Sequence, residues 1–243
     1  MGELSVWQWV LSLCVVAVAY VVRGMAGFGS GLIATPLFLM FMPITQAVPL
    51  VVVLDYLASA AQGLKDRPLI AWPEIWPLLP SAILGVITAT WLFHSVDAVL
   101  LVRILAIVLI AIAVYQLWAP VASSKASKKW AMPAGALGGL IGTLFGTGGP
   151  FYVAYLQARK LDKGAFRATF STLFLLDGAN RLVSYAWSGF FTLRFLAVLA
   201  WLMPIMVLGM YVGRRLHTSI TQETFRRGIS VLLLLSGAVL LFK

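Results

Sequence analysis

The sequence predicts an all-α polytopic membrane protein built from two inverted repeats, and three observations support this fold class. Of the 243 residues, 61% are hydrophobic and only 11% are charged, whereas soluble domains carry roughly 25% charged residues. Apolar runs of about 20 residues, the length that spans a bilayer, follow one another along the chain. Two glycine-rich segments interrupt these runs at corresponding places in the two halves. We therefore expect a single transmembrane domain over residues 1–243.

The two halves share one plan, which indicates an internal duplication. We expect a first repeat over 1–121, a linker over 122–130 and a second repeat over 131–243. In each repeat, a helical hairpin broken by glycine precedes three transmembrane helices. Identical residues also recur at one register between the two halves. These pairs are Pro80/Pro204, Leu84/Leu208, Gly85/Gly209, Leu92/Leu216, Ser95/Ser219 and Arg103/Arg227.

Each expected helix follows from an apolar run and the polar, glycine or proline residues that bound it. The first repeat contains the expected helices Leu4–Val22, Leu32–Met42, Thr45–Gly63, Ile75–Phe93 and Ala98–Trp118. The second repeat contains Trp130–Leu144, Phe151–Ala158, Ala168–Trp187, Phe195–Gly213 and Gly228–Phe242.

The two interruptions, Gly24–Gly31 and Gly146–Pro150, hold too many glycines for a helix interior. At membrane depth such backbone is tolerated only if it is buried in protein or lines a cavity. Broken helices in corresponding positions of two halves point to a transporter's binding site. A helix that begins there offers unpaired N–H groups and a positive dipole end, which together bind an anion.

We therefore predict a substrate site at the two breaks, with Ser30 and Thr147 donating from matching places. The predicted binding residues there are Gly29, Ser30, Gly31, Gly146, Thr147, Gly148 and Gly149. Close helix packing is the alternative role for glycine in a membrane. We favour packing for the four glycines that are spaced as small-xxx-small motifs, namely Gly135, Gly138, Gly139 and Gly142.

Three ionisable residues, Asp55, Asp177 and Arg181, lie inside apolar helices. Each costs about 2.5–3.5 kcal/mol to insert at the bilayer centre, so such residues mark pathways or proton relays. Asp177 and Arg181 are four residues apart, which leaves an internal ion pair and a substrate role both open for Arg181. Asn180 adds a polar group beside it. We assign Asn180 and Arg181 to substrate binding, and Asp55 and Asp177 to coupling.

Enzyme machinery is missing from the sequence. The chain has no metal-ligand spacing, no nucleophile paired with a base, and no nucleotide-binding glycine-rich motif that ends in Lys-Ser or Lys-Thr. Its two histidines, His94 and His217, lie in expected loops, and its one cysteine, Cys14, lies in an apolar helix. We therefore predict no catalytic residue, no metal and no cofactor, and a protein that is not an enzyme.

The distribution of the 18 Lys and Arg residues predicts how the repeats are oriented. Suppose the linker is cytoplasmic and each broken hairpin returns to the face that it entered. Most basic residues then lie inside, as the positive-inside rule requires, whereas parallel repeats would move a four-arginine loop outside. Inverted repeats with both termini outside are therefore favoured. The inside residues are Lys65, Arg67, Lys125, Lys128, Lys129, Arg159, Lys160, Lys163, Arg167, Arg214, Arg215, Arg226 and Arg227.

Two motifs resemble those of a known family. The segment Ala26–Pro36, AGFGSGLIATP, and its echo Gly139–Pro150, GLIGTLFGTGGP, are similar to the sulfite exporter TauE/SafE family, also called the toluene sulfonate uptake permease family. The resemblance covers essentially the whole chain. It implies an inner-membrane permease for sulfur-containing or carboxylated organic anions, such as sulfite or sulfoacetate.

We therefore expect a multi-pass secondary transporter of the inner membrane. Its substrate is a small organic or sulfur oxyanion such as sulfite, a sulfonate or a carboxylate, with coupling to protons or to the membrane potential left open. An anion channel, an integral-membrane enzyme and a scaffold protein are the alternatives. The expected partners are the anionic substrate and the lipid bilayer but no nucleic acid, and a homodimer is left open.

Overall fold

The computed structural model describes residues 5–63, 67–118, 126–216 and 222–242, which form α-helices, two 3-10 turns and short connections without a strand. The first half contains α1 (Val6–Ala26), α2 (Ser30–Leu39), α3 (Ile44–Gly63), η1 (Arg67–Leu69), α4 (Trp72–Ile75), α5 (Leu79–Ser95) and α6 (Ala98–Trp118). The second half contains η2 (Lys128–Trp130), α7 (Ala131–Phe145), α8 (Gly149–Ala158), α9 (Lys163–Trp187), α10 (Leu193–Arg215) and α11 (Gln222–Leu241).

The all-helical membrane architecture predicted from the sequence is confirmed. Among the described residues, four segments are long and apolar enough to cross a bilayer: Val6–Ala26, Ile44–Ala61, Ala98–Tyr115 and Leu193–Arg215. Large apolar side chains on the outer helices point away from the protein, for example Trp91, which is 65% exposed, and Trp201, which is 71% exposed. A surface of this kind is suited to lipid rather than to water.

The first broken hairpin consists of α1 and α2. Helix α1 ends where Gly27 takes a left-handed conformation (φ 85°), and Gly29 does the same (φ 98°) before α2 begins. At the closed end, Arg23 donates to Ser30 at 2.9 Å. At the open end, the Gln8 amide donates to the Phe41 carbonyl oxygen at 3.2 Å. The two helices therefore run antiparallel, and α1 extends one turn beyond the predicted end.

The second broken hairpin, α7 and α8, repeats this geometry. Helix α7 ends at Gly146, which is again left-handed (φ 68°), and α8 begins at Gly149. At the open end, the Ala126 N–H donates to the Ala158 carbonyl oxygen at 2.9 Å. Both predicted helix breaks are thus present, and the helix ends that border them lie within four residues of the expected positions.

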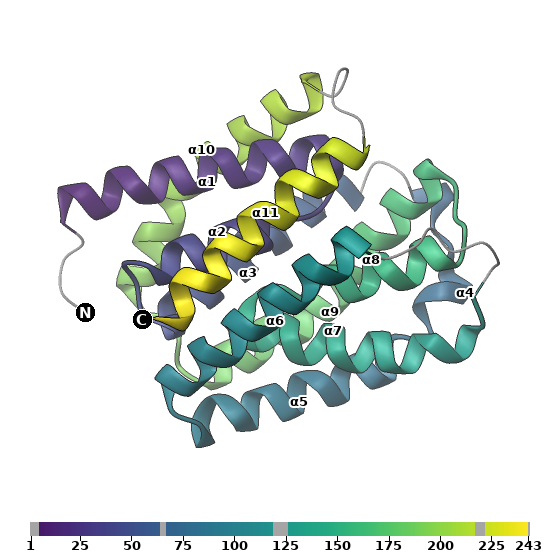
Figure 1. The fold of residues 1–243 in the computed structure, drawn as a ribbon, viewed down its shortest axis with the longest axis horizontal. Helices are drawn as coiled ribbons and strands as arrows, with labels where there is room; N and C mark the ends of the chain where they lie inside the picture. Colours follow the sequence, from purple (N-terminus) through teal and green to yellow (C-terminus); the bar gives the residue numbers. More distant parts are fainter. Residues whose placement is uncertain (1–4, 64–66, 119–125, 217–221, 243) are drawn as a thin grey trace.

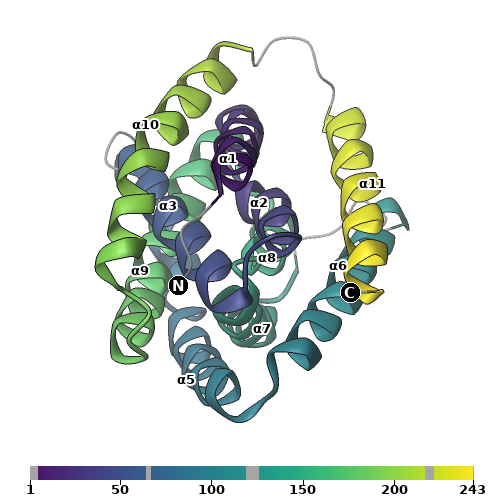
Figure 2. The same ribbon diagram turned by 90° about the vertical axis from the view of Figure 1, so that its left-hand side faces the viewer.

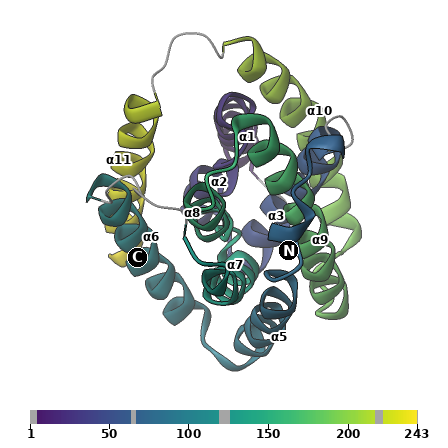
Figure 3. The same cartoon turned by 90° about the vertical axis from the view of Figure 1, so that its right-hand side faces the viewer.

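The two hairpins lie in the centre of the molecule and open toward opposite ends of it (Figure 1). Viewed along the long axis, α3, α9 and α10 cover one side of the hairpins, α6 and α11 cover the other, and α5 lies beside α7 (Figures 2 and 3). The most extensive helix contacts are α5 with α7, α1 with α10, α6 with α11 and α3 with α9. Each of these pairs joins the first half of the chain to the second.

Some predicted boundaries were wrong for local reasons. The single helix expected over Ile75–Phe93 is divided into α4 and α5, with Pro80 in the first turn of α5, where a missing N–H costs nothing. Helix α9 starts at Lys163 rather than Ala168, because the Asp162 carboxylate caps it by accepting from the N–H groups of Gly164 and Ala165. Residues 122–125 of the predicted linker, Lys65 and His217 lie outside the described residues, as do the side chains of Arg226 and Arg227.

Candidate substrate site between the two helix breaks

The two helix breaks lie directly against each other. A Cβ atom at Gly31 would collide with the carbonyl oxygen of Gly146, so only glycine permits this approach. Gly146 in turn faces the hydroxyl of Thr35 on α2. Segments more than a hundred residues apart in the chain are therefore joined at the point where both helices are interrupted.

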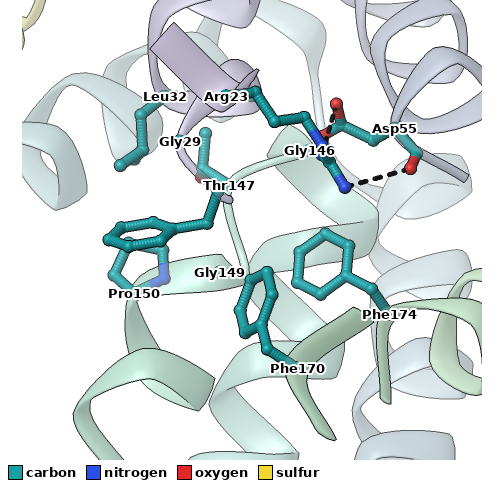
Figure 4. A pocket seen from close by; sticks show the side chains of 12 residues that line it. Arg23, Gly29, Leu32, Asp55, Gly146, Thr147, Gly149, Pro150, Phe170 and Phe174 are labelled. Carbon is teal, nitrogen blue, oxygen red and sulfur yellow. Dashed lines mark hydrogen bonds and ion pairs between the residues drawn. The ribbon is translucent and has the colours of Figure 1, made fainter. Parts of the chain in front are cut away.

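A small cavity opens beside this contact (Figure 4). Its free volume, about 10 Å³, holds about one water molecule. The lining combines two charged side chains and one hydroxyl with glycine backbone and an apolar wall. The lining residues are Arg23, Asp55 and Thr147, then Gly29, Gly31, Gly146 and Gly149, and finally Phe28, Leu32, Pro150, Phe170 and Phe174.

Five of the nine predicted substrate residues line this cavity, whereas Ser30, Gly148, Asn180 and Arg181 are not in its lining. The Ser30 hydroxyl instead donates to Asp55 Oδ1 at 2.5 Å and accepts from Arg23. A Cβ atom at Gly148 would collide with the carbonyl oxygen of Gly138. Gly148 thus allows α7 and the start of α8 to pack, which is the alternative role that sequence reasoning placed second.

The expected equivalence of Ser30 and Thr147 does not hold. Gly27 and Gly146 are both left-handed residues that end the first helix of a hairpin. With these two residues matched, Ser30 corresponds to Gly149, and Thr147 corresponds to Phe28. Thr147 lies in the linker between α7 and α8 and is 1% exposed, and its hydroxyl has no hydrogen-bond partner among the described residues.

Asp55 belongs to a buried cluster that joins α1, α2 and α3. Its Oδ1 atom accepts from Tyr20 (2.7 Å) and Ser30 (2.5 Å) and pairs with Arg23 Nη1 at 2.9 Å. The second guanidinium nitrogen, Nη2, donates to the Ser59 hydroxyl at 2.6 Å and to the Asp55 carbonyl oxygen at 3.3 Å. We call Asp55, Arg23 and Tyr20 the first trio. Both Arg23 and Asp55 line the cavity.

Asp177 forms a second trio with Arg181 and Tyr152. Asp177 Oδ2 pairs with Arg181 Nη2 and accepts from the Tyr152 hydroxyl at 2.8 Å. Arg181 also donates to the Gly138 carbonyl oxygen at 3.1 Å. Asp177 is 0% exposed and Arg181 is 2% exposed, and neither lines the cavity. The internal ion pair that the sequence left open is therefore formed.

Phe174 lies between the two trios. Its ring centroid is 5.8 Å from Cζ of Arg23 and 5.6 Å from Cζ of Arg181, which is within the range of cation–π attraction. Because Phe174 also lines the cavity (Figure 4), one aromatic ring holds two buried guanidinium groups beside the candidate site.

The remaining predicted residues lie outside the cavity lining. The Asn180 amide donates to the Leu176 carbonyl oxygen one turn back on α9 at 3.2 Å, outside the cavity. A Cβ atom at Gly135 would collide with the Ser81 hydroxyl and the Leu78 carbonyl oxygen at the start of α5, and one at Gly139 with the Ala82 carbonyl oxygen in α5, so the packing expected for these two glycines is confirmed. Two further glycines of α7 make room for the second trio: Gly138 faces the Tyr152 ring, and Gly142 faces the Arg181 guanidinium.

A third trio lies at the open end of the α7–α8 hairpin. Glu74 in α4 accepts from Tyr155 at 2.7 Å and from Arg159 through Nε and Nη2, each at 2.9 Å. Burial alone would raise the pKa of the Glu74 carboxyl, but the hydrogen bonds from Arg159 and Tyr155 outweigh it and hold the pKa below its usual value.

Sequence reasoning missed Arg23, Tyr20, Tyr152 and Phe174. A visible signal existed for Arg23, since a charged side chain near the end of an apolar run must find a partner. Its position three residues after Tyr20 also places both side chains on one face of a helix. The aromatic residues carried no comparable signal, because aromatic side chains are common throughout this chain.

Comparison with known proteins now adds to this geometry. The sequence profile described as Sulfite exporter TauE/SafE matches residues 12–240. The chain belongs to this family. It is also similar to a protein of Comamonas testosteroni described as "Probable inner membrane transporter protein TsaS", with 27% identity over 191 residues, which is 77% of this chain and 80% of that protein. No solved structure matches the chain. The family and this relative indicate a membrane transporter and give no indication of an enzyme.

Proposed function

We propose that this family member is a permease that carries a small oxyanion, such as sulfite, a sulfonate or a carboxylate, across the inner membrane. The observation that carries the proposal is the position of Thr147. Its buried hydroxyl has no hydrogen-bond partner in the described part of the chain, and Thr147 lines the cavity just before the first turn of α8. That turn adds a positive dipole end, and the cationic side chain of Arg23 lies in the same lining.

The proposed carrier binds the anion between the breaks, where Gly29, Gly31, Gly146 and Gly149 keep the backbone accessible. Arg181 and Asp177 do not contact the anion in this proposal. They hold Phe174 and the start of α8 in place. A cavity with room for about one water molecule is compatible with the closed intermediate that a carrier requires. The relative's description as an inner membrane transporter supports the proposed location.

We further propose that the two halves are inverted repeats with the basic end in the cytoplasm. The opposite openings of the two hairpins support this (Figure 1), as do the exchanged contacts of α1 with α10 and of α7 with α5. Single cysteines introduced at Lys128, Lys163 and Arg215 should react only with reagents supplied from the cytoplasmic side. Reaction of Lys163→Cys from outside, with Lys128→Cys protected there, would rule out this topology.

Transport is tested with purified protein in proteoliposomes. A panel of sulfite, methanesulfonate, benzenesulfonate and acetate should contain at least one anion that raises the thermal unfolding temperature. The same anion should then exchange across the vesicle membrane with saturable kinetics. A conductance without saturation would instead indicate a channel. No stabilisation and no flux for any anion would rule out the proposed function.

A further inference from the structure

We propose that anion binding at this site is linked to protonation of Asp55, because both the anion and the Asp55 carboxylate require Arg23. The inference rests on the proposed function and adds the coupling ion, a proton. It follows from the arrangement of the first trio around the cavity rather than from the presence of a buried acid.

Arg23 has little capacity left for an additional anion. Nη1 is shared between Ser30 and Asp55, and Nη2 between Ser59 and the backbone oxygen of Asp55. Nε alone has no partner among the described residues. Arg23 is 1% exposed, so bulk water does not reach it. An oxyanion in the cavity must therefore share this guanidinium with Asp55 or take Asp55's place on it.

If the anion and Asp55 share Arg23, two negative charges lie beside one positive charge. Asp55 is 4% exposed and lies in the cavity lining, and in an interior of low dielectric constant the repulsion between like charges is strong. Adding one proton to Asp55 removes that repulsion and releases Arg23 for the anion. Asp55 then becomes a hydrogen-bond donor, and the hydroxyls of Tyr20 and Ser30, which donate to the ionised carboxylate, can remain as its neighbours.

The groups that face Asp55 leave its charge to be balanced by Arg23. Helix α1 contributes Tyr20 and Arg23, and α2 contributes the neutral hydroxyl of Ser30. The break after α7 contributes neutral Gly146 and Thr147, and α9 contributes Phe174, with Arg181 near its ring. Tyr56, the neighbour of Asp55 on α3, packs against α9 at Gly178. One proton taken up with one monovalent anion would therefore preserve the charge of the site.

The second trio provides the matched control. Asp177 is paired as closely as Asp55, but neither Asp177 nor Arg181 lines the cavity. An anion in the cavity does not compete for Arg181, so the charge of Asp177 does not oppose anion entry directly. The structure thus assigns proton linkage to Asp55 and a positioning role to Asp177, although the sequence analysis assigned both carboxylates to coupling.

The test measures methanesulfonate binding, because this anion keeps one charge across the pH range used. Titration calorimetry at pH 5.5 to 8.5, in buffers of different ionisation enthalpy, counts the protons taken up on binding. We expect close to one proton per anion and a Kd that weakens by up to tenfold per pH unit on the alkaline side. Asp55→Asn should bind with the affinity that the wild type shows at low pH, without proton uptake and without pH dependence. Asp177→Asn should keep the wild-type slope.

The wild-type proton count is decisive even if Asp55→Asn folds poorly, because it requires no variant. Binding without proton uptake would overturn this inference and leave the proposed permease in place. A pH slope that survives in Asp55→Asn would also overturn it. If neither methanesulfonate nor any other anion of the panel binds at any pH, the proposed function fails and the linkage fails with it.

Discussion

The first and second trios are built from the same three residue types, an aspartate, an arginine and a tyrosine, but they are assembled in different ways. Asp177 takes its arginine from the next turn of the same helix and its tyrosine from α8. Asp55 takes both Arg23 and Tyr20 from α1, a different helix. The first trio opens on the cavity, and the second is closed behind Phe174. The same arrangement, a buried aspartate paired with an arginine and a tyrosine, therefore occurs in both trios. Only the first trio lies where a substrate in the cavity could contact it.

The largest expected effect comes from leaving one partner of either buried pair alone. Arg23→Gln and Arg181→Gln should each destabilise the protein by about 3–5 kcal/mol, because an uncompensated carboxylate stays buried. The double variants Asp55→Asn/Arg23→Gln and Asp177→Asn/Arg181→Gln should regain most of this loss. Thermal unfolding of purified protein in detergent measures both steps.

Anion binding by the two double variants then separates the trios. The variant without Asp177 and Arg181 should still bind the anion, whereas the variant without Asp55 and Arg23 should fold but fail to bind. If both double variants lose binding, Arg181 acts on the substrate and the contrast between the trios disappears.

Neighbouring glycines of the second break give the next largest effect. Gly148→Ala should destabilise the protein by about 1–3 kcal/mol or more, since its methyl group meets the α7 backbone at Gly138. Gly149→Ala is the matched control, because its methyl group would lie 3.6 Å from Phe174 Cζ, an ordinary contact distance. It should fold normally but bind the anion less well, because the methyl group occupies the cavity. Equal losses of stability in both variants would show that the break serves packing alone.

The contrast between the trios also explains which features of the structure could be predicted from the sequence. Both helix breaks and most helix boundaries follow from local composition, since glycine and proline act on the helix in which they lie. The Asp177–Arg181 pair is equally local, because residues four apart share a helix face. Arg23 and Asp55 are separated by a hairpin and half of α3, and no spacing rule connects them.

The positions of Ser30 and Thr147 were mispredicted for a related reason. The short motifs FGSG and FGTG match letter by letter, but the left-handed glycines that end α1 and α7 fix a register two residues away from that match. Backbone conformation, rather than the similarity of letters, decides which residue begins the next helix. The contact between Gly31 and Gly146 could not be predicted from the sequence either, because it depends on how two hairpins that are far apart in the chain pack together.

The next comparison concerns anion binding rather than stability and uses the two buried threonines near the breaks, whose hydroxyls have no partner among the described residues. Thr147→Val should weaken anion binding by roughly 1.5–3 kcal/mol, the value of a hydrogen bond to a charged group, or about tenfold or more in Kd. Thr35→Val is the control, since Thr35 is buried but does not line the cavity. The anion affinity of the Thr35→Val variant should equal that of the wild type. Equal affinity of Thr147→Val and wild type for every anion would remove Thr147 from the site.

The smallest effect concerns the third trio, which extends the comparison to a carboxylate far from the cavity. The pKa of Glu74 is lowered in the folded protein, so its ionised form stabilises the fold at pH values above the unfolded pKa of about 4.3. This contribution is lost as the pH falls through the lowered folded value. The unfolding temperature of the wild type should therefore fall between pH 6 and pH 3.5 by more than that of Glu74→Gln. Asp97→Asn, which replaces an exposed carboxylate, should follow the wild type.

Anion affinity at neutral pH should be the same in all three proteins, because Glu74 is not in the cavity lining. A parallel acid-induced loss in Glu74→Gln would show that this trio does not depend on the Glu74 charge, and weakened anion binding would show that the open end of the α7–α8 hairpin is coupled to the site.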